Sequence, residues 1–300
     1  MKLIKLACIF ILLLCSEPVI AGDAVSSLNG KMAFSYGDMD SNRGKNLTGS
    51  VSSPISKNIG IQIDGLYTNV SDRDFYGAGI QIFWRDSEIG LLGGSFAGVN
   101  ESDMYSLTGG FVGEYYLDLF TFGLSAGYAK INYDNPVLFI DTDKTEPYIG
   151  CSIGVYPIDD LLFEFAYNYV FENHLYQCNI EYQTPLNGLC VFADLAKGDN
   201  DYDQSLFGLR YYFGKQKTLK KRHREDDPQN AVNGVLSNIG TYGAEYNASV
   251  KKYNARAQAY NENLLNDPGI TPLLFEQYAM PVYDNPDDFG FLLSTPYEDF

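Results

Sequence analysis

The chain has 300 residues, of which 45% are hydrophobic and 15% aromatic, and this composition excludes wholesale disorder. Its formal net charge of -17 disfavours nucleic acid as a partner, because phosphate backbones bind cationic surfaces. Of the five cysteines, Cys8 and Cys15 lie in the N-terminal segment, and those that remain are too few and odd in number for a disulfide framework.

Residues 1–21 have the features of a secretory signal peptide. Two lysines precede an apolar stretch from Leu6 to Leu14, and the following residues fit a cleavage site before Gly22. A lipoprotein signal at Cys15 is disfavoured, because Leu14 stands where a small side chain is expected. The segment is too short to anchor the protein in a membrane. The mature protein is therefore expected to begin at Gly22 and to be exported.

Between about residue 28 and residue 213, apolar and polar residues alternate in stretches of about ten residues. This is the length that a tilted strand needs to cross hydrocarbon, and only helices and closed barrels satisfy their backbone polar groups in lipid. The pattern predicts an all-β fold, a transmembrane antiparallel β-barrel over residues 22–214 with about twelve strands, or alternatively ten. The expected strands are residues 28–36, 46–53, 58–68, 75–84, 89–97, 104–116, 120–131, 146–156, 161–171, 175–183, 189–196 and 204–213.

The connections between these strands differ in length. Short connections such as residues 85–88 and 185–188 carry turn residues and are expected on the periplasmic side. Residues 37–45, 132–145 and 197–203 are longer and acidic, as outward loops of such barrels are. Their carboxylates suit calcium, but the remainder of a calcium-binding loop is missing, so no metal site is predicted.

Alternation also separates a lipid face from a lumen face. Within residues 161–171, Leu161 and every second residue up to Phe171 are expected to face lipid, and the residues between them to face inward. Charged strand residues are assigned to the lumen, because a cation facing lipid at mid-depth costs on the order of 2–4 kcal/mol and an acid less. The resulting lumen-lining candidates are Asp64, Glu114, Glu164, Glu181, Asp194 and Arg210.

The last predicted strand resembles the β-signal that ends outer-membrane barrel proteins. Gly208 is followed by the alternating aromatic residues Tyr211 and Phe213, the second of them at the end of the strand. The resemblance to this bacterial, porin-like family of outer-membrane β-barrel proteins implies two partners, outer-membrane lipid and the barrel-assembly machinery. The chain departs from the family pattern at Leu206, where a polar residue is common, and by continuing beyond the signal.

Residues 215–300 are expected to form a periplasmic tail. Residues 215–224 hold six basic residues and no acid, and they either meet anionic lipid headgroups or form a solvated end to the barrel. Further on, helical spacing predicts a helix near residues 243–265. Its apolar stripe comprises Tyr246, Val250, Tyr253, Ala257, Tyr260 and Leu264. The remainder of the tail, a periplasmic protein partner or the barrel mouth must cover this stripe.

Neither catalysis nor a cofactor is expected. An outer-membrane hydrolase is disfavoured, because His174 is the one histidine in an expected external loop and no His-x-Ser or Asp-x-His pair accompanies it. Two functions remain open. The first is a small porin-like channel whose acidic lumen favours cations. The second is a non-conducting structural or interaction barrel whose tail docks a partner in the periplasm.

Overall fold

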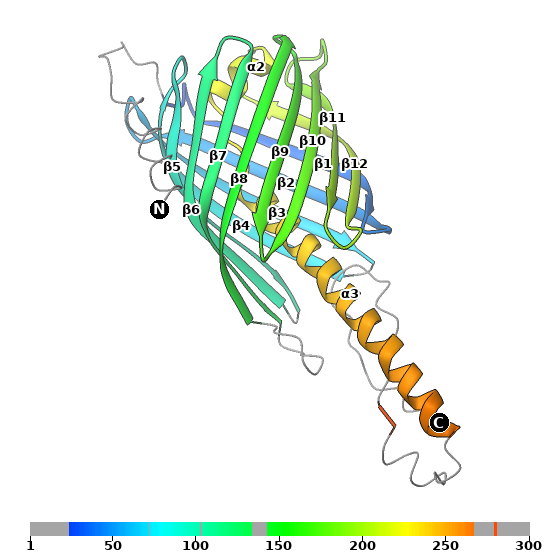
Figure 1. Cartoon of the computed structure of the whole chain (residues 1–300). Coiled ribbons are helices and arrows are strands. Elements are labelled where there is room, and N and C mark those ends of the chain that lie inside the picture. The colour runs from blue at the N-terminus through cyan, green and yellow to red at the C-terminus, as the bar shows by residue number, and fades with distance from the viewer. Residues whose placement is uncertain (1–23, 72, 103, 134–142, 267–278, 281–300) are drawn as a thin grey trace.

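The computed structural model of the protein describes residues 24–71, 73–102, 104–133, 143–266 and 279–280, so the predicted signal peptide lies outside the described residues. Within them, twelve strands form a closed antiparallel barrel in which sequence neighbours pair and β1 pairs with β12 (Figure 1). The strands are β1 (Asn29–Met39), β2 (Asn42–Pro54), β3 (Ile59–Val70), β4 (Arg73–Asp86), β5 (Gly90–Glu101), β6 (Met104–Leu117), β7 (Phe120–Tyr133), β8 (Asp143–Ile158), β9 (Leu161–Val170), β10 (Asn173–Gln183), β11 (Leu189–Gly198) and β12 (Asp203–Phe213). The predicted twelve-stranded all-β barrel is confirmed.

Most strands are longer than predicted, and the connections are correspondingly shorter. Residues 37–45, predicted as an outward loop, are mostly strand, and Asp40 and Ser41 alone connect β1 to β2. Both residues have positive φ, 49° and 66°, as in the primed turns whose twist suits a hairpin. Polar residues such as Asp38 and Arg43 face each other across the β1–β2 ladder, so their polarity does not end the strands.

The barrel has two ends, which we call near and far. Asn29 and Phe213 lie at the near end, whereas the hairpin turn at residues 40–41 lies at the far end (Figure 1). The far end also holds the predicted outward loop at residues 197–203, which is reduced to the short connection between β11 and β12. Most of the third predicted outward loop, residues 132–145, lies outside the described residues.

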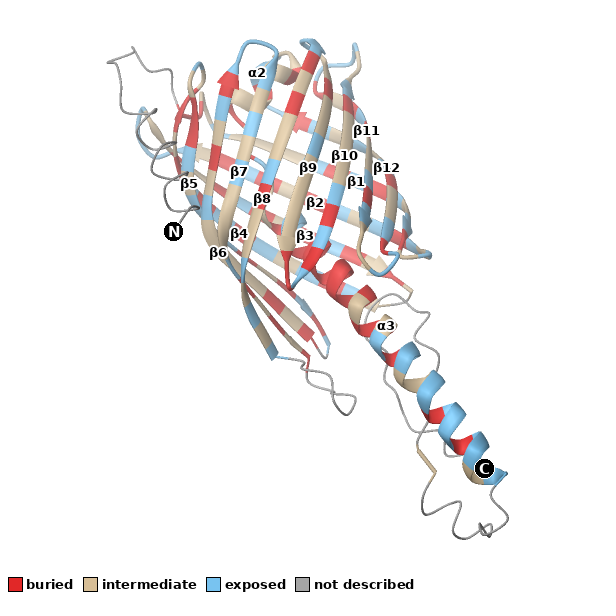
Figure 2. Cartoon of the chain, viewed as in Figure 1, coloured by how far each residue is buried: buried red, intermediate tan, exposed pale blue. Residues whose placement is uncertain are grey.

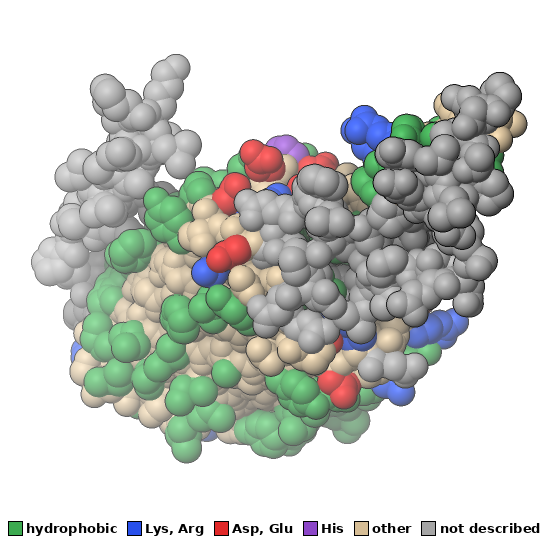
Figure 3. All heavy atoms as spheres, turned by 90° about the horizontal axis from the view of Figure 1, so that it is seen from below, with side chains coloured by type: hydrophobic (Ala, Val, Ile, Leu, Met, Phe, Trp, Pro, Cys, Tyr) green, Lys and Arg blue, Asp and Glu red, His purple; other side chains and the backbone are tan. Residues whose placement is uncertain are grey.

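Exposed and buried residues alternate along the strands (Figure 2). In β3, Ile63 is 58% exposed on the outer wall, whereas its neighbours Gln62 and Asp64 are buried in the interior. Figure 3, a view of the far end, shows hydrophobic side chains around the visible part of the outer wall. The alternation in the sequence therefore corresponds to an apolar outer face and a separate inner face.

The residues after β12 do not extend away from the near end, as a separate tail would. Gly214 has a φ of 101°, which favours glycine, and the chain then turns back toward the barrel interior. Helix α2 (Leu219–Glu225) lies at the near end, and α3 (Ala231–Leu265) begins inside the barrel and leaves through the far end (Figure 1). Among the described residues, no helix is long and apolar enough to cross a membrane.

Helix α3 includes the predicted helix but begins well before residue 243. Its N-cap is Asn230, whose side chain accepts hydrogen bonds from the backbone N–H groups of Val232 and Asn233. Gly234 and Gly240 lower the helical propensity of the first half of α3, so the sequence pattern did not predict a helix there. Packing against the barrel wall compensates for that low propensity.

Buried apolar side chains in the far half of the lumen form a shared core between α3 and the barrel wall, which we call the apolar collar. Its wall members are Met39, Leu66, Val70, Phe75, Ala97, Val99, Met104, Ala129, Ile131, Tyr133, Val170, Phe171, Leu175, Ala196, Tyr202 and Leu206, and its helix members are Val232, Val235, Leu236, Ile239, Tyr242, Ala244, Tyr246 and Val250. Phe171 was expected to face lipid. It is buried instead, because it lies in the β9–β10 turn with a φ of 51° and its ring packs 5.6 Å from that of Tyr242.

Two glycines of β4 make room for α3. A Cβ on Gly77 would lie 2.5 Å from Cγ1 of Val232 and 3.0 Å from Cγ2 of Val99, and one on Gly79 would lie 3.0 Å from Cγ2 of Val232. Contacts this short require a neighbouring group to move. The absence of side chains at these two positions therefore sets how closely the helix approaches the wall.

We expect Gly77→Val to overpack this contact and to destabilise the protein by about 1–3 kcal/mol. Gly65→Ala is the matched control, because a Cβ on Gly65 would have no atom within 4 Å. Urea unfolding of both variants in detergent, together with protease cleavage of α3, measures the effect. Equal stability and equal protease resistance of the two variants would contradict the packing of α3 on β4.

Candidate functional site

Helix α2 is fitted into the near end of the barrel. Leu219 is fully buried in an apolar cluster with wall residues that include Tyr212. Arg222 is 2% exposed and donates from Nε to Gln183 Oε1 at 2.9 Å, and Arg224 donates to the backbone oxygen of Phe120 at 2.7 Å. The basic segment at residues 215–224, expected to be solvated or to meet lipid headgroups, is therefore packed against the barrel through several of its cations.

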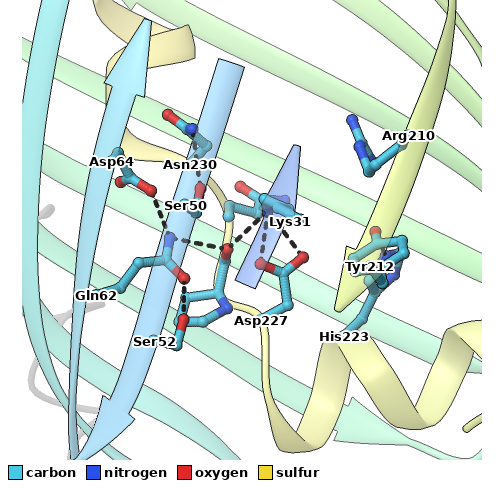
Figure 4. Close-up of polar contacts among 12 residues, drawn as sticks. Lys31, Ser50, Ser52, Gln62, Asp64, Arg210, Tyr212, His223, Asp227 and Asn230 are labelled. Carbon is cyan, nitrogen blue, oxygen red and sulfur yellow. Dashed lines mark hydrogen bonds and ion pairs between the residues drawn. The ribbon is translucent and has the colours of Figure 1, made fainter. Parts of the chain in front are cut away.

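The link between α2 and α3 is held by polar side chains of the wall (Figure 4). Lys31 forms an ion pair with Asp227 at 2.7 Å, and Gln62 donates to the backbone oxygen of Pro228 at 3.3 Å. The N–H of Ala231 donates to Asp64 Oδ2 at 3.1 Å. A non-helical segment inside a lumen needs partners for its backbone groups, and these side chains supply them.

All six predicted lumen residues have side chains that point inward, and all but Asp64 line one common cavity. Asp64 lies instead at the N-terminus of α3, where it also accepts a hydrogen bond from Gln62. Inside the cavity, Glu181 forms an ion pair with Arg210 and accepts a hydrogen bond from Tyr212 at 3.0 Å. The remaining wall carboxylates that line it are Glu114, Glu164 and Asp194.

The cavity has a volume of about 350 Å³ and lies between α3 and the wall formed mainly by β6 to β12. Helix α3 contributes Asn233 and Ser237 to its lining, and the adjoining link contributes Gln229, which donates to Glu164 at 2.5 Å. Helix α3 contacts β3, β4, β5, β6 and β10. The cavity lies beside the first two turns of α3, residues 231–238, whereas the apolar collar surrounds the helix closer to the far end.

His223 belongs to the basic segment at residues 215–224, which was expected to meet lipid headgroups or to be solvated, yet it lies in the wall of this cavity. Its Nδ1 is 2.9 Å from the hydroxyl of Tyr156 and its Nε2 is 2.8 Å from the hydroxyl of Tyr212. Burial lowers the pKa of His223 to about 4, and nearby cations act in the same direction, whereas the negative charge of Glu181 opposes the shift. Those cations are Arg210, Lys31 and Arg85.

The predicted β-signal residues occupy the end of β12. A Cβ on Gly208 would lie 2.4 Å from the backbone oxygen of Phe34, so the ladder with β1 leaves no room for a side chain there. Tyr211 and Phe213 are exposed on the outer wall with their rings 5.0 Å apart in an edge-on arrangement. Both aromatic side chains are therefore accessible from outside the barrel.

The predicted helix stripe is covered only in part by the barrel mouth. Tyr246 and Val250 belong to the apolar collar, and Tyr253 packs against it. Ala257 is buried and Leu264 is half-buried, while Tyr260 is 43% exposed. Beyond the barrel, Asn261 exchanges two hydrogen bonds of 2.8 Å with the backbone of Met280.

His174, the candidate base of a hydrolase, lies on β10 at the far end. Its Nδ1 is 2.8 Å from the hydroxyl of Tyr167, and its backbone N–H donates to Asp199 at 2.8 Å. Among the described residues, His174 forms no hydrogen bond with a serine or threonine hydroxyl. Within the same residues, no group of three His, Cys, Asp or Glu side chains is arranged to hold a metal ion.

No protein-family model matches the chain, and no curated protein matches it. The fold is similar to several solved outer-membrane porins and channels. The KdgM porin is 10% identical with a TM-score of 0.49, covering 61% of this chain and 99% of that one. The NanC porin is 8% identical with a TM-score of 0.47, covering 63% and 100%. The COG4313 outer membrane channel from Pseudomonas putida F1 is 7% identical with a TM-score of 0.44, covering 66% and 98%. At these identities the likeness concerns the fold alone.

We expect the pKa of His223 to make stability depend on pH. Because this pKa is about 4 in the folded protein and near 6.5 in an unfolded chain, the unfolded state binds the proton first as the pH falls. The contribution of neutral His223 is complete above pH 6.5 and is lost between pH 6.5 and pH 4, by up to about 3 kcal/mol.

Urea unfolding at pH 7.5 and at pH 4.5 tests this dependence in the wild type and in His223→Gln, which stays neutral throughout. The stability advantage of the wild type over His223→Gln should shrink at the lower pH. His174→Gln, at an exposed position of the far end, is the control and should keep the pH dependence of the wild type. An advantage that does not change with pH would contradict the partly buried, neutral state of His223.

Proposed function

We propose that the protein is an outer-membrane, porin-like β-barrel whose channel is closed by its own C-terminal segment. The outer wall supports the membrane location, because Phe111, Tyr128 and Phe207 are 73%, 66% and 62% exposed and belong to an apolar surface around the barrel. A water-facing surface of this extent would be a liability, whereas lipid suits it. The β-signal residues supply the strand that the barrel-assembly machinery would recognise.

The apolar collar is the single observation that carries the closed state. The interior of an open channel is polar, yet the far half of this lumen presents Leu66, Val70, Phe75 and Ile131 to α3. Burying each side chain of this kind contributes roughly 1.5–3 kcal/mol. A gate that opens by thermal fluctuation requires states that differ by only a few kcal/mol. The number of collar residues therefore favours a resident plug over a mobile gate.

The polar cavity favours a second candidate, a restricted passage for small cations beside α3. Glu114, Glu164, Glu181 and Asp194 line the space together with two wall cations, Lys31 and Arg210. An excess of carboxylates in a narrow lumen attracts cations and repels anions. In this case the protein would be a weakly conducting channel rather than a closed barrel.

Conductance in planar bilayers separates these two functions. We expect the full mature chain to give no conductance steps, and a chain that ends at Gly214 to give open, cation-selective steps, because the plug is gone and the wall carboxylates remain. Small cation-selective steps from the full chain would favour the second candidate. Identical steps from both chains would contradict closure by the C-terminal segment.

Because the shortened chain must fold for this test, heat-modifiable migration of each preparation serves as its control. A second variant keeps the whole chain and replaces two collar residues, Val235→Asp and Ile239→Asp. Burying two carboxylates among apolar groups should expel α3 and open the channel. The exposed substitution Ala259→Asp, on the same helix beyond the barrel, should leave the channel closed.

A further inference from the structure

We infer that α3 carries the chain through the barrel, so that residues 248–265 stand outside the cell, on the side of the membrane opposite Asn29 and Phe213. This inference rests on the proposed outer-membrane function. It replaces the sequence-based expectation that everything after residue 214 stays in the periplasm. The barrel would then serve as an anchor that displays its own C-terminal helix.

Contacts along the segment follow one direction through the lumen. At the near end, Lys217 and Asp226 form an ion pair of 2.6 Å, and both bond to Ser26, which precedes β1. Near mid-height, Asn230 donates to Ser50 at 3.2 Å. At the far end, a Cβ on Gly198 would lie 3.1 Å from Cγ2 of Thr241. The chain therefore crosses the barrel once, from near end to far end.

The length of α3 is sufficient for this crossing. Its 35 residues span about 52 Å at 1.5 Å per residue, whereas the hydrocarbon core is about 30 Å thick. Figure 1 shows the helix extending well beyond the far end of the strands. Figure 2 shows that its inner part is buried, whereas its outer part presents a largely exposed surface.

Specific contacts hold the helix where it leaves the barrel. Glu245 forms an ion pair of 3.2 Å with Lys144 and accepts a hydrogen bond of 2.7 Å from Asn173. The ring of Tyr246 packs edge-on against Tyr133 at 5.9 Å. The ion pair, the hydrogen bond and the aromatic contact thus involve separate strands and meet on one turn of α3, as expected if the helix occupies this exit permanently.

The exposed residues of the outer part suit water. We call residues 248–265 the stalk. Its surface is polar where it faces away from the buried stripe, because the exposed residues there include Lys252, Arg256, Gln258, Glu262 and Asn263. Such a surface does not suit lipid and needs an aqueous compartment.

The orientation of the barrel decides which aqueous compartment this is. Twelve crossings leave Asn29 and Phe213 on the same side. Barrels of this kind carry their longer connections outside and their short turns in the periplasm. Consecutive strands are separated by at most five residues elsewhere, whereas nine lie between Tyr133 at the end of β7 and Asp143 at the start of β8, both at the far end, where α3 also leaves. The far end, and with it the stalk, is therefore assigned to the outside.

Labelling of single cysteines tests the inference. In a background with Cys151, Cys178 and Cys190 replaced by alanine, Ala259→Cys places a thiol on the exposed stalk, and Ser56→Cys places one on an exposed near-end turn. Intact cells are treated with a maleimide coupled to polyethylene glycol too large to pass the outer membrane. We expect Ala259→Cys to be labelled in intact cells, and Ser56→Cys to be labelled only after permeabilisation.

Fractionation and heat-modifiable migration of the same samples test the outer-membrane function separately from the display of residues 248–265. If the protein is a folded barrel in the outer membrane but Ala259→Cys reacts only after permeabilisation, the display is refuted and the proposed function stands. Labelling of both positions in intact cells, or of Ser56→Cys alone, also refutes the display. Recovery of the protein from a soluble fraction would refute the proposed function itself.

Discussion

Packing between α3 and the inner wall is the interaction on which the rest of the structure depends. A twelve-stranded barrel satisfies its own backbone hydrogen bonds, but it leaves an interior that water, side chains or another segment must fill. Here Leu66, Phe75 and Ile131 face inward where a water-filled channel would have polar groups, and Val232, Ile239 and other residues of α3 cover them. The glycines at positions 77 and 79 fit the same arrangement, since side chains there would push the helix away.

Polar contacts then determine how the segment is threaded. The link before α3 is not helical, and its backbone groups find partners in Gln62 and Asp64, while Asp227 meets Lys31. Removing one partner of such a buried pair leaves an uncompensated charge, which costs more than the intact pair contributes. The collar therefore supplies the free energy that retains α3, and the charged network at the near end supplies its register and direction.

Local patterns in the sequence predicted the barrel, because alternation and pairing of successive strands are local properties. In β3, the apolar side chain of Ile63 and the charged side chain of Asp64 indicate that these neighbours lie on opposite faces of the strand, and no other part of the fold is needed for that prediction. The plug was not predicted, because its partners are remote: Val232 meets Gly77, and Arg224 meets Phe120. Considered without its remote partners, a run of basic residues such as 215–224 is typical of a solvent-exposed segment. One signal was available, since the inward positions Leu66 and Val70 near the far end of β3 are apolar as well as the outward ones, and something must cover them.

A disulfide between the helix and the wall tests the central claim, that α3 resides in the lumen, most directly. Gly198→Cys and Thr241→Cys, in a chain without its natural cysteines, would place two thiols in contact, because a Cβ on Gly198 would lie 3.1 Å from Cγ2 of Thr241. Mild oxidation of cells followed by mass spectrometry of a non-reduced digest should recover the two peptides joined. If both thiols stay free, while each single variant still folds as a barrel, α3 does not occupy the lumen and the account is contradicted.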